Sequence, residues 1–179
     1  RVRIDRQEYV ETREGAGRST RGALPPGTIG EIQEPPPGAN GAHPDWNTYD
    51  YVPNDELINW GDSDSRVDPA ILEIARRMAR SLGVTLNVVS GYRDRQRNAD
   101  ADGARNSNHM YGEAIDLAYI GGSGEERRRM LVAAIEAGAQ GIGHYDDSNF
   151  MHIDLGPKRT WNRPQPAWAA ATMSAAGLV

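Results

Sequence analysis

The sequence predicts an α+β protein in which a mainly antiparallel sheet carries its helices on one side. Two observations lead to this fold class. Hydrophobic periodicity between residues 68 and 155 follows the order helix, strand, strand, helix, strand, strand, and the strand segments are short. The length of 179 residues accommodates one domain of roughly 120–140 residues with an extension, but not two full-sized domains.

The first predicted helix begins at Asp68, a good N-cap residue, and Pro69 suits the first helical position. Gly83 is placed where a left-handed residue ends a helix. A short β-branched strand is predicted next, over 84–90. Between these limits, apolar residues recur at helical spacing: Ile71, Leu72, Ile74, Ala75, Met78 and Leu82.

Residues 91–108 are rich in Arg, Asp and Asn, and we expect them to form a loop of about eighteen residues. A loop of this length inside a compact domain is usually functional. A second strand is predicted over 113–119. The pair Ser123 and Glu126 then forms a capping box, which predicts a helix through about Ala137.

Two further strands are predicted near 141–145 and 150–155, separated by a turn at 146–149. Together with the preceding helices they complete a globular domain over 46–162. Residues 163–179 are predicted to form a C-terminal tail, either a short Ala-rich helix or a frayed end.

Residues 1–45 are predicted to be an extended arm or linker, because their density of Pro and Gly prevents a helix or a strand from propagating. The alternative is a long ordered loop wrapped on the domain. The chain starts at Arg1 without an initiator Met, so we expect a processed or trimmed start.

Composition excludes several classes of protein and of site. The formal net charge of -5 disfavours non-specific nucleic-acid binding, which normally needs a basic excess. No apolar run approaches the ~18 residues that span a bilayer, so we expect no membrane insertion. The absence of cysteine excludes disulfides, thiolate metal sites and a cysteine nucleophile, so any metal must be held by His, Asp or Glu.

Two histidine–aspartate pairs indicate a metal site. His109 precedes Asp116 by seven residues, and His152 and Asp154 lie two apart in the last predicted strand, where they share one face. Two imidazoles and one carboxylate on adjacent strands can bind one zinc ion and leave a fourth position for water. For a lone histidine in a strand, a hydrogen-bonded or surface position is the alternative.

The residues around these pairs form a specific motif set. The segment 107–116 fits the pattern S-x-H-x-x-G-x-A-x-D, the segment 90–93 reads SGYR, and 150–161 contains His-x-Asp followed by Arg-x-Trp. This combination resembles the zinc D-Ala-D-Ala carboxypeptidases and L-Ala-D-Glu endopeptidases of bacterial cell walls, a group that includes the hedgehog signalling domain. The resemblance covers roughly residues 54–161 and implies a hedgehog/DD-peptidase-like fold.

The resemblance assigns zinc to His109, Asp116 and His152. It also implies that Arg93 binds a substrate carboxylate or the developing oxyanion, for which a planar guanidinium is well suited. Ser107 resembles a substrate-contacting serine, with a loop-capping role as the alternative.

For Arg93 the alternative role is a surface salt bridge with Asp94 or Asp100. For Asp154, we expect its carboxylate to orient a ligand imidazole or Arg159. Direct ligation of zinc by Asp154 is the alternative.

The general base is where this sequence departs from the family pattern. Many relatives carry Glu three residues before the last zinc histidine, and others carry His two residues before it; here these positions hold Asn149 and Phe150. The hedgehog-like arrangement has a Glu six residues before, and Asp146 occupies that place. We therefore predict Asp146 as the base, with Asp147 and His144 as substitutes.

These inferences predict a zinc-dependent peptidoglycan peptidase that hydrolyses an amide bond in the murein stem peptide or cross-link, as an endopeptidase or a carboxypeptidase. The alternative is a non-catalytic, zinc-stabilised module that binds the cell wall or a protein. Either could belong to a phage tail or similar particle, with residues 1–45 contacting the particle. The expected location is periplasmic, extracellular or virion-associated.

Overall fold

The computed structural model of the protein describes residues 47–144 and 148–161, together with residues 172, 174 and 175. The predicted arm over 1–45 and most of the predicted tail over 163–179 lie outside the described residues, as do Asp146 and Asp147. No helix among the described residues is both long and apolar enough to cross a membrane.

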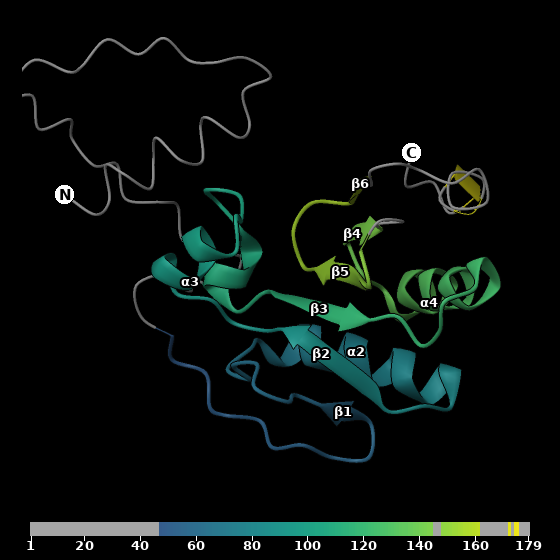
Figure 1. Ribbon diagram of the computed structural model, residues 1–179, viewed down its shortest axis with the longest axis horizontal. Helices are drawn as coiled ribbons and strands as arrows, with labels where there is room; N and C mark the ends of the chain where they lie inside the picture. Colours follow the sequence, from purple (N-terminus) through teal and green to yellow (C-terminus); the bar gives the residue numbers. More distant parts are fainter. Residues whose placement is uncertain (1–46, 145–147, 162–171, 173, 176–179) are drawn as a thin grey trace, which may run out of the picture.

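A six-stranded sheet in the order β1-β2-β3-β5-β4-β6 forms the centre of the domain (Figure 1). Its strands are β1 (Ile58–Asn59), β2 (Leu86–Ser90), β3 (Ala114–Ala118), β4 (Gly141–His144), β5 (Phe150–Asp154) and β6 (Arg159–Trp161). The pairings β2–β3, β3–β5 and β5–β4 are antiparallel, whereas β1–β2 and β4–β6 are parallel.

The α+β class is therefore consistent with the structure, but the sheet is mixed. The difference arises at the two edges, where β1 and β6 are strands of only two and three residues that hydrophobic periodicity does not reveal. Both are held in the sheet by pairing with longer neighbours, which is a tertiary effect.

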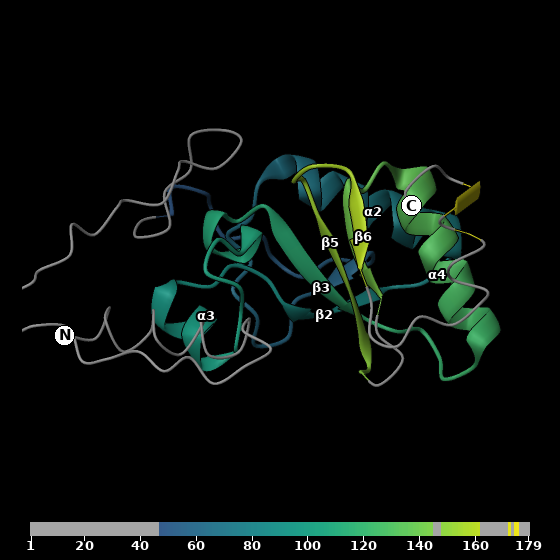
Figure 2. The same cartoon turned by 90° about the horizontal axis from the view of Figure 1, so that it is seen from above.

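The two long helices, α2 (Pro69–Leu82) and α4 (Gly124–Ala137), pack against each other and against one face of the sheet. Figure 1 shows α2 behind β2 and β3, and Figure 2 shows α4 at the end of the sheet opposite α3 (Arg95–Asp100). One apolar cluster joins the layers, with fully buried members that include Ile71, Met78, Leu131, Ile115 and Ile153.

Local signals define the ends of both helices as predicted. The Asp68 carboxylate accepts a hydrogen bond from the Ala70 N–H at 2.7 Å, and Gly83 ends α2 with a left-handed φ of 67°. Ser123 and Glu126 form the reciprocal capping box at the start of α4.

The predicted loop over 91–108 contains two short helices instead of being irregular throughout. These are α3 and the 3-10 helix η1 (Asn108–Tyr111). α3 has no apolar stripe; it is held by Asp94, which accepts from the Arg97 N–H at 2.8 Å, and by buried Asn98, which donates to the Ala104 carbonyl at 2.9 Å. Periodicity cannot reveal a helix that polar contacts stabilise.

Side chains along β3 and β5 alternate between the apolar core and the opposite face of the sheet, which we call the functional face. Ile115 and Leu117 of β3, with Met151 and Ile153 of β5, are fully buried toward the helices. The residues between them point to the opposite face. That face carries Asp116 and His152, which the antiparallel register places directly opposite each other.

Two glycines of β4 leave room for side chains on the functional face. A Cβ at Gly141 would lie well inside van der Waals distance of the Asp154 carboxylate, and a Cβ at Gly143 would lie 2.7 Å from the Trp161 indole. Both glycines are therefore required by close packing rather than by backbone conformation.

We predict that Gly141→Ala lowers the free energy of unfolding by about 1–3 kcal/mol, because the added methyl group must displace a buried carboxylate. Gly122→Ala is the matched control, since a Cβ there meets no described atom within 4 Å. Urea denaturation of the three proteins measures the difference; equal stability of the two variants would contradict this packing argument.

Candidate metal centre

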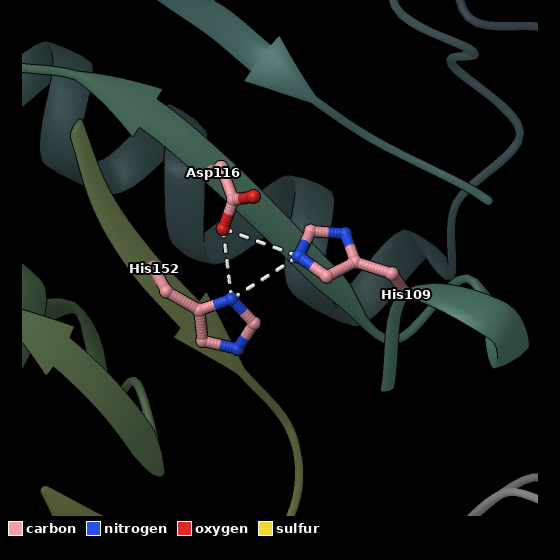
Figure 3. Close-up of side chains that lie close together, drawn as sticks. All are labelled: His109, Asp116 and His152. Atoms are coloured by element: carbon pink, nitrogen blue, oxygen red, sulfur yellow. Dashed lines mark hydrogen bonds and ion pairs between the residues drawn. The ribbon is translucent and has the colours of Figure 1, made fainter. Parts of the chain in front are cut away.

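Three side chains from three elements converge on the functional face (Figure 3). His109 comes from η1, Asp116 from the middle of β3 and His152 from the middle of β5. Gly112, with φ of 69°, ends η1 and turns the chain into β3, so that His109 folds back over Asp116. The spacing of the sequence motif therefore brings His109 and Asp116 together through one 3-10 turn followed by one strand.

The three inner atoms form a compact triangle. His109 Nε2 lies 3.1 Å from Asp116 Oδ1 and 3.1 Å from His152 Nδ1, and His152 Nδ1 lies 2.8 Å from Asp116 Oδ1. All three residues are buried. Ligands of a tetrahedral zinc ion, bound at about 2.0–2.1 Å, lie about 3.3 Å apart, so this triangle has the size of a zinc ligand set.

The outer hydrogen bonds determine which nitrogen of each imidazole faces the cluster. His109 Nδ1 lies 2.7 Å from the Gly91 carbonyl oxygen, which can only accept, so this nitrogen carries the proton. His152 Nε2 lies 3.0 Å from Asp154 Oδ2 and likewise donates. In the neutral rings, His109 Nε2 and His152 Nδ1 therefore present lone pairs to the Asp116 carboxylate, and three acceptors face one another.

The pKa shifts reflect this crowding of acceptors. Burial lowers the pKa of His109, which keeps its ring neutral. Burial also acts to lower the pKa of His152, but the carboxylates of Asp116 and Asp154 outweigh it and raise that pKa. For Asp116, burial alone would raise the pKa, yet the two imidazoles hold it well below its usual range. The centre thus retains an ionised carboxylate, as a metal ligand requires.

Arg93 lies inside the cluster rather than on the surface. Its Nη2 donates to Asp116 Oδ2 and lies 3.2 Å from His109 Nε2, while its Nε donates to Ser90 Oγ at 2.7 Å. The predicted alternative, a salt bridge to a neighbouring acid of its own loop, is wrong, because its ion-pair partner is Asp116. By holding one oxygen of Asp116, Arg93 leaves the other oxygen to face the imidazoles.

Asp154 lies on the outer side of the His152 ring. Its carboxylate accepts from His152 and from the Arg159 guanidinium, and both hydrogen bonds keep its pKa low although burial alone would raise it. The group of potential ligand atoms consists of His109, Asp116 and His152. Its contacts with the His152 ring and with Arg159 are those that an orienting role requires, and that role stays a prediction.

The other predicted site residues that the structure describes are Ser107 and His144. Ser107 precedes η1 and makes no side-chain capping bond to it, so its predicted contact with substrate stays a prediction. His144 is unsuited to act as the base: it lies on the helix side of β4, fully buried, with its Nδ1 2.7 Å from the Tyr119 hydroxyl. Strand alternation turns its side chain away from the cluster.

Sequence reasoning missed the place of β6 beside this centre. The Trp161 ring lies 5.1 Å from the His152 ring, and the Arg159 guanidinium lies 4.8 Å from the Trp161 ring. The Arg-x-Trp spacing was the available signal, because residues two apart on a strand share a face. Nothing in the sequence indicates that this segment pairs with β4.

We predict that the protein binds one zinc ion. Loss of a hydrogen-bond partner of a ligand typically lowers metal affinity by about 10–100-fold. His152→Ala should lower zinc affinity by more than this, because it removes a ligand itself. His144→Gln is the matched control, since it alters a buried histidine on the opposite face of the sheet. Titration with zinc against a competing chelator measures both. A similar loss of affinity in the two variants would contradict the assignment of the ligands.

Comparison with known proteins agrees with the motifs. The family model described as Peptidase M15 matches residues 51–154. The chain is 32% identical over 125 residues to the probable peptidoglycan L,D-endopeptidase MepK of Haemophilus influenzae, covering 63% of this chain and 61% of the relative. It is 33% identical over 102 residues to the peptidoglycan L,D-endopeptidase MepK of Escherichia coli K12, covering 53% and 54%. The chain thus spans about half to three-fifths of these relatives.

Proposed function

The chain belongs to the peptidase M15 family, and from this premise we propose that it is a zinc-dependent peptidoglycan peptidase. Its substrate is peptidoglycan, in which it hydrolyses an amide bond of the murein stem peptide or cross-link. The names of the curated relatives support an endopeptidase acting on an L,D bond. Residues 46–162 form the peptidase domain, with the hedgehog/DD-peptidase-like fold that the motifs imply.

The observation that carries this proposal is the convergence of three acceptor atoms from His109, Asp116 and His152 within hydrogen-bond distance of one another. Acceptors repel one another unless a proton or a cation lies among them. Of these three residues, the Arg93 guanidinium contacts only Asp116, at Oδ2, and the His109 ring, so it does not fill the space between the three inner atoms. Two imidazoles with one carboxylate form the donor set of a catalytic zinc site with an open position. These three residues are therefore the proposed ligands.

Bound zinc would supply Lewis-acid chemistry, activating a water molecule and polarising the scissile carbonyl group. The protein residues orient the reaction around it. The Gly91 carbonyl and the Asp154 carboxylate hold the two imidazoles with their lone pairs inward. The Arg93 guanidinium, beside His109 and Asp116, stabilises negative charge on the carbonyl oxygen or holds a substrate carboxylate. Ser107 contacts the substrate.

Asp146 is the proposed general base, from its place six residues before His152 in the sequence. We predict that Asp146→Asn lowers turnover by about 10²–10⁴-fold and leaves zinc affinity unchanged, because a proton acceptor is lost but no ligand. Asp147→Asn is the matched control and keeps its turnover. If Asp147→Asn lost turnover and Asp146→Asn kept it, the base would be assigned to Asp147 instead.

The central test is digestion of purified peptidoglycan, with the products identified by mass spectrometry. We expect stem-peptide fragments from the wild-type protein, and their loss after treatment with a chelator and in His152→Ala. The fragment masses identify the bond that is cut. Intact peptidoglycan after incubation with fully zinc-loaded protein would overturn the enzymatic proposal.

A second candidate is a zinc-stabilised module that binds the cell wall or a protein without hydrolysing it. The observation that favours it is the replacement of the usual base by Asn149 and Phe150. Sedimentation with intact peptidoglycan tests it: this candidate requires retention of the zinc-loaded protein on the polymer without release of fragments. For the enzyme and for a module that binds the cell wall, the proposed partner is peptidoglycan. The location we propose is therefore periplasmic, extracellular or virion-associated.

A further inference from the structure

Strand β6 brings two side chains over the His152 region. It pairs with β4 in parallel, so that Arg159 lies opposite Gly141 and Trp161 opposite Gly143. Because neither glycine has a side chain, Arg159 and Trp161 can lie across β4 against the functional face of β5. The Cβ positions that alanine would occupy at 141 and 143 fall on the Asp154 carboxylate and the Trp161 indole.

The Asp154 carboxylate is fully buried and accepts four hydrogen bonds. Arg159 binds it as a fork, with Nη1 at 3.0 Å from Oδ1 and Nη2 at 2.6 Å from Oδ2. Oδ1 also accepts from the Gly156 N–H at 2.8 Å, and Oδ2 from His152 Nε2 at 3.0 Å. A bidentate fork fixes the plane of the carboxylate, because both oxygens must face the guanidinium.

This orientation decides which nitrogen of His152 faces the centre. With its plane fixed by Arg159, the carboxylate directs Oδ2 at the outer nitrogen of the ring, which must then donate. The inner nitrogen, Nδ1, keeps its lone pair toward Asp116 and His109. The His109 ring is held differently, by the Gly91 carbonyl oxygen of the main chain.

We infer that Arg159 is a positioning residue for the metal centre: acting through Asp154, it holds the His152 ring with Nδ1 ready to bind the metal. This inference rests on the proposed zinc site and deepens it. Trp161 supports the same arrangement, since its ring packs at 54° to the His152 ring and the Arg159 guanidinium packs on that indole. Arg159 itself contacts none of the three proposed ligands' inner atoms.

The test compares zinc-loaded wild-type protein with Arg159→Gln, Arg159→Lys and the control Arg128→Gln, which breaks an exposed ion pair with Glu125 on α4. The first measurement is the rate of zinc transfer to a chelator. The second is the hydrogen-exchange rate of the outer imidazole N–H groups, observed by NMR in protein labelled with ¹⁵N-histidine. His109 provides an internal reference, because its N–H bonds to a carbonyl that Arg159 does not contact.

We expect Arg159→Gln to weaken zinc binding by about 10–100-fold, mainly through faster release, and to accelerate exchange at His152 but not at His109. Arg159→Lys should recover part of both effects, since an ammonium group supplies the charge without the fork. Arg128→Gln should match the wild type. If Arg159→Gln does not fold, Arg159→Lys carries the comparison, with smaller changes in the same direction.

Three results would overturn the inference. In the first, zinc release and His152 exchange in Arg159→Gln equal those of the wild type. In the second, exchange increases equally at both histidines, which indicates that the substitution loosens the whole domain. Failure of the wild-type protein to bind zinc would overturn the proposed metal site itself. Zinc binding by the wild type with no effect of Arg159→Gln overturns only the positioning role, so the two failures are distinguishable.

Discussion

The register between β3 and β5 is the constraint on which the candidate centre depends. Asp116 faces His152 because these two residues are direct partners in an antiparallel pair, with Ile115 opposite Ile153 and Leu117 opposite Met151 on the other face. A slip of one residue would exchange the two faces, burying the polar side chains among the helices and exposing the core. The free energy of burying the apolar side chains therefore also holds the proposed ligands together.

Two similar pairs of a buried carboxylate and an arginine lie on the two sides of the His152 ring. Each of the two buried carboxylates faces an imidazole with one oxygen and forms an ion pair with an arginine: Asp116 with Arg93, and Asp154 with Arg159, whose guanidinium contacts both oxygens. A buried carboxylate is costly unless it is paired and hydrogen-bonded. Here each arginine offsets that cost and at the same time orients the carboxylate toward a histidine.

The two glycines of β4 leave the space that these carboxylate and arginine contacts require. β4 carries glycine at the two positions that face Asp154 and Trp161, and Ile142 and His144 at the positions that face the helices. The same strand thus completes the core with one face and admits the β6 side chains with the other. His144 shows the consequence for function. It follows Gly143, the register partner of His152, by one residue, and strand alternation turns its side chain to the opposite face.

Several elements follow from local signals, and the structure reproduces them closely. The two long helices depend on the Asp68 cap, the capping box at Ser123 and their apolar stripes, and β2, β3, β4 and β5 lie within the predicted ranges. By contrast, β1, β6 and α3 are too short or too polar to show a period of their own. Their conformation depends on partners distant in the sequence, so no local pattern predicts it.

For the centre, the residue types, their spacing and the family can be read directly from the chain, because a motif of hydrogen-bonding and metal-binding side chains is a local property. Tertiary structure decided the rest: which nitrogen of each imidazole faces inward, that Arg93 pairs with Asp116, and that Arg159 and Trp161 reach Asp154 and His152. These contacts join strands and loops far apart in sequence, and their geometry exists only once the sheet register brings them together.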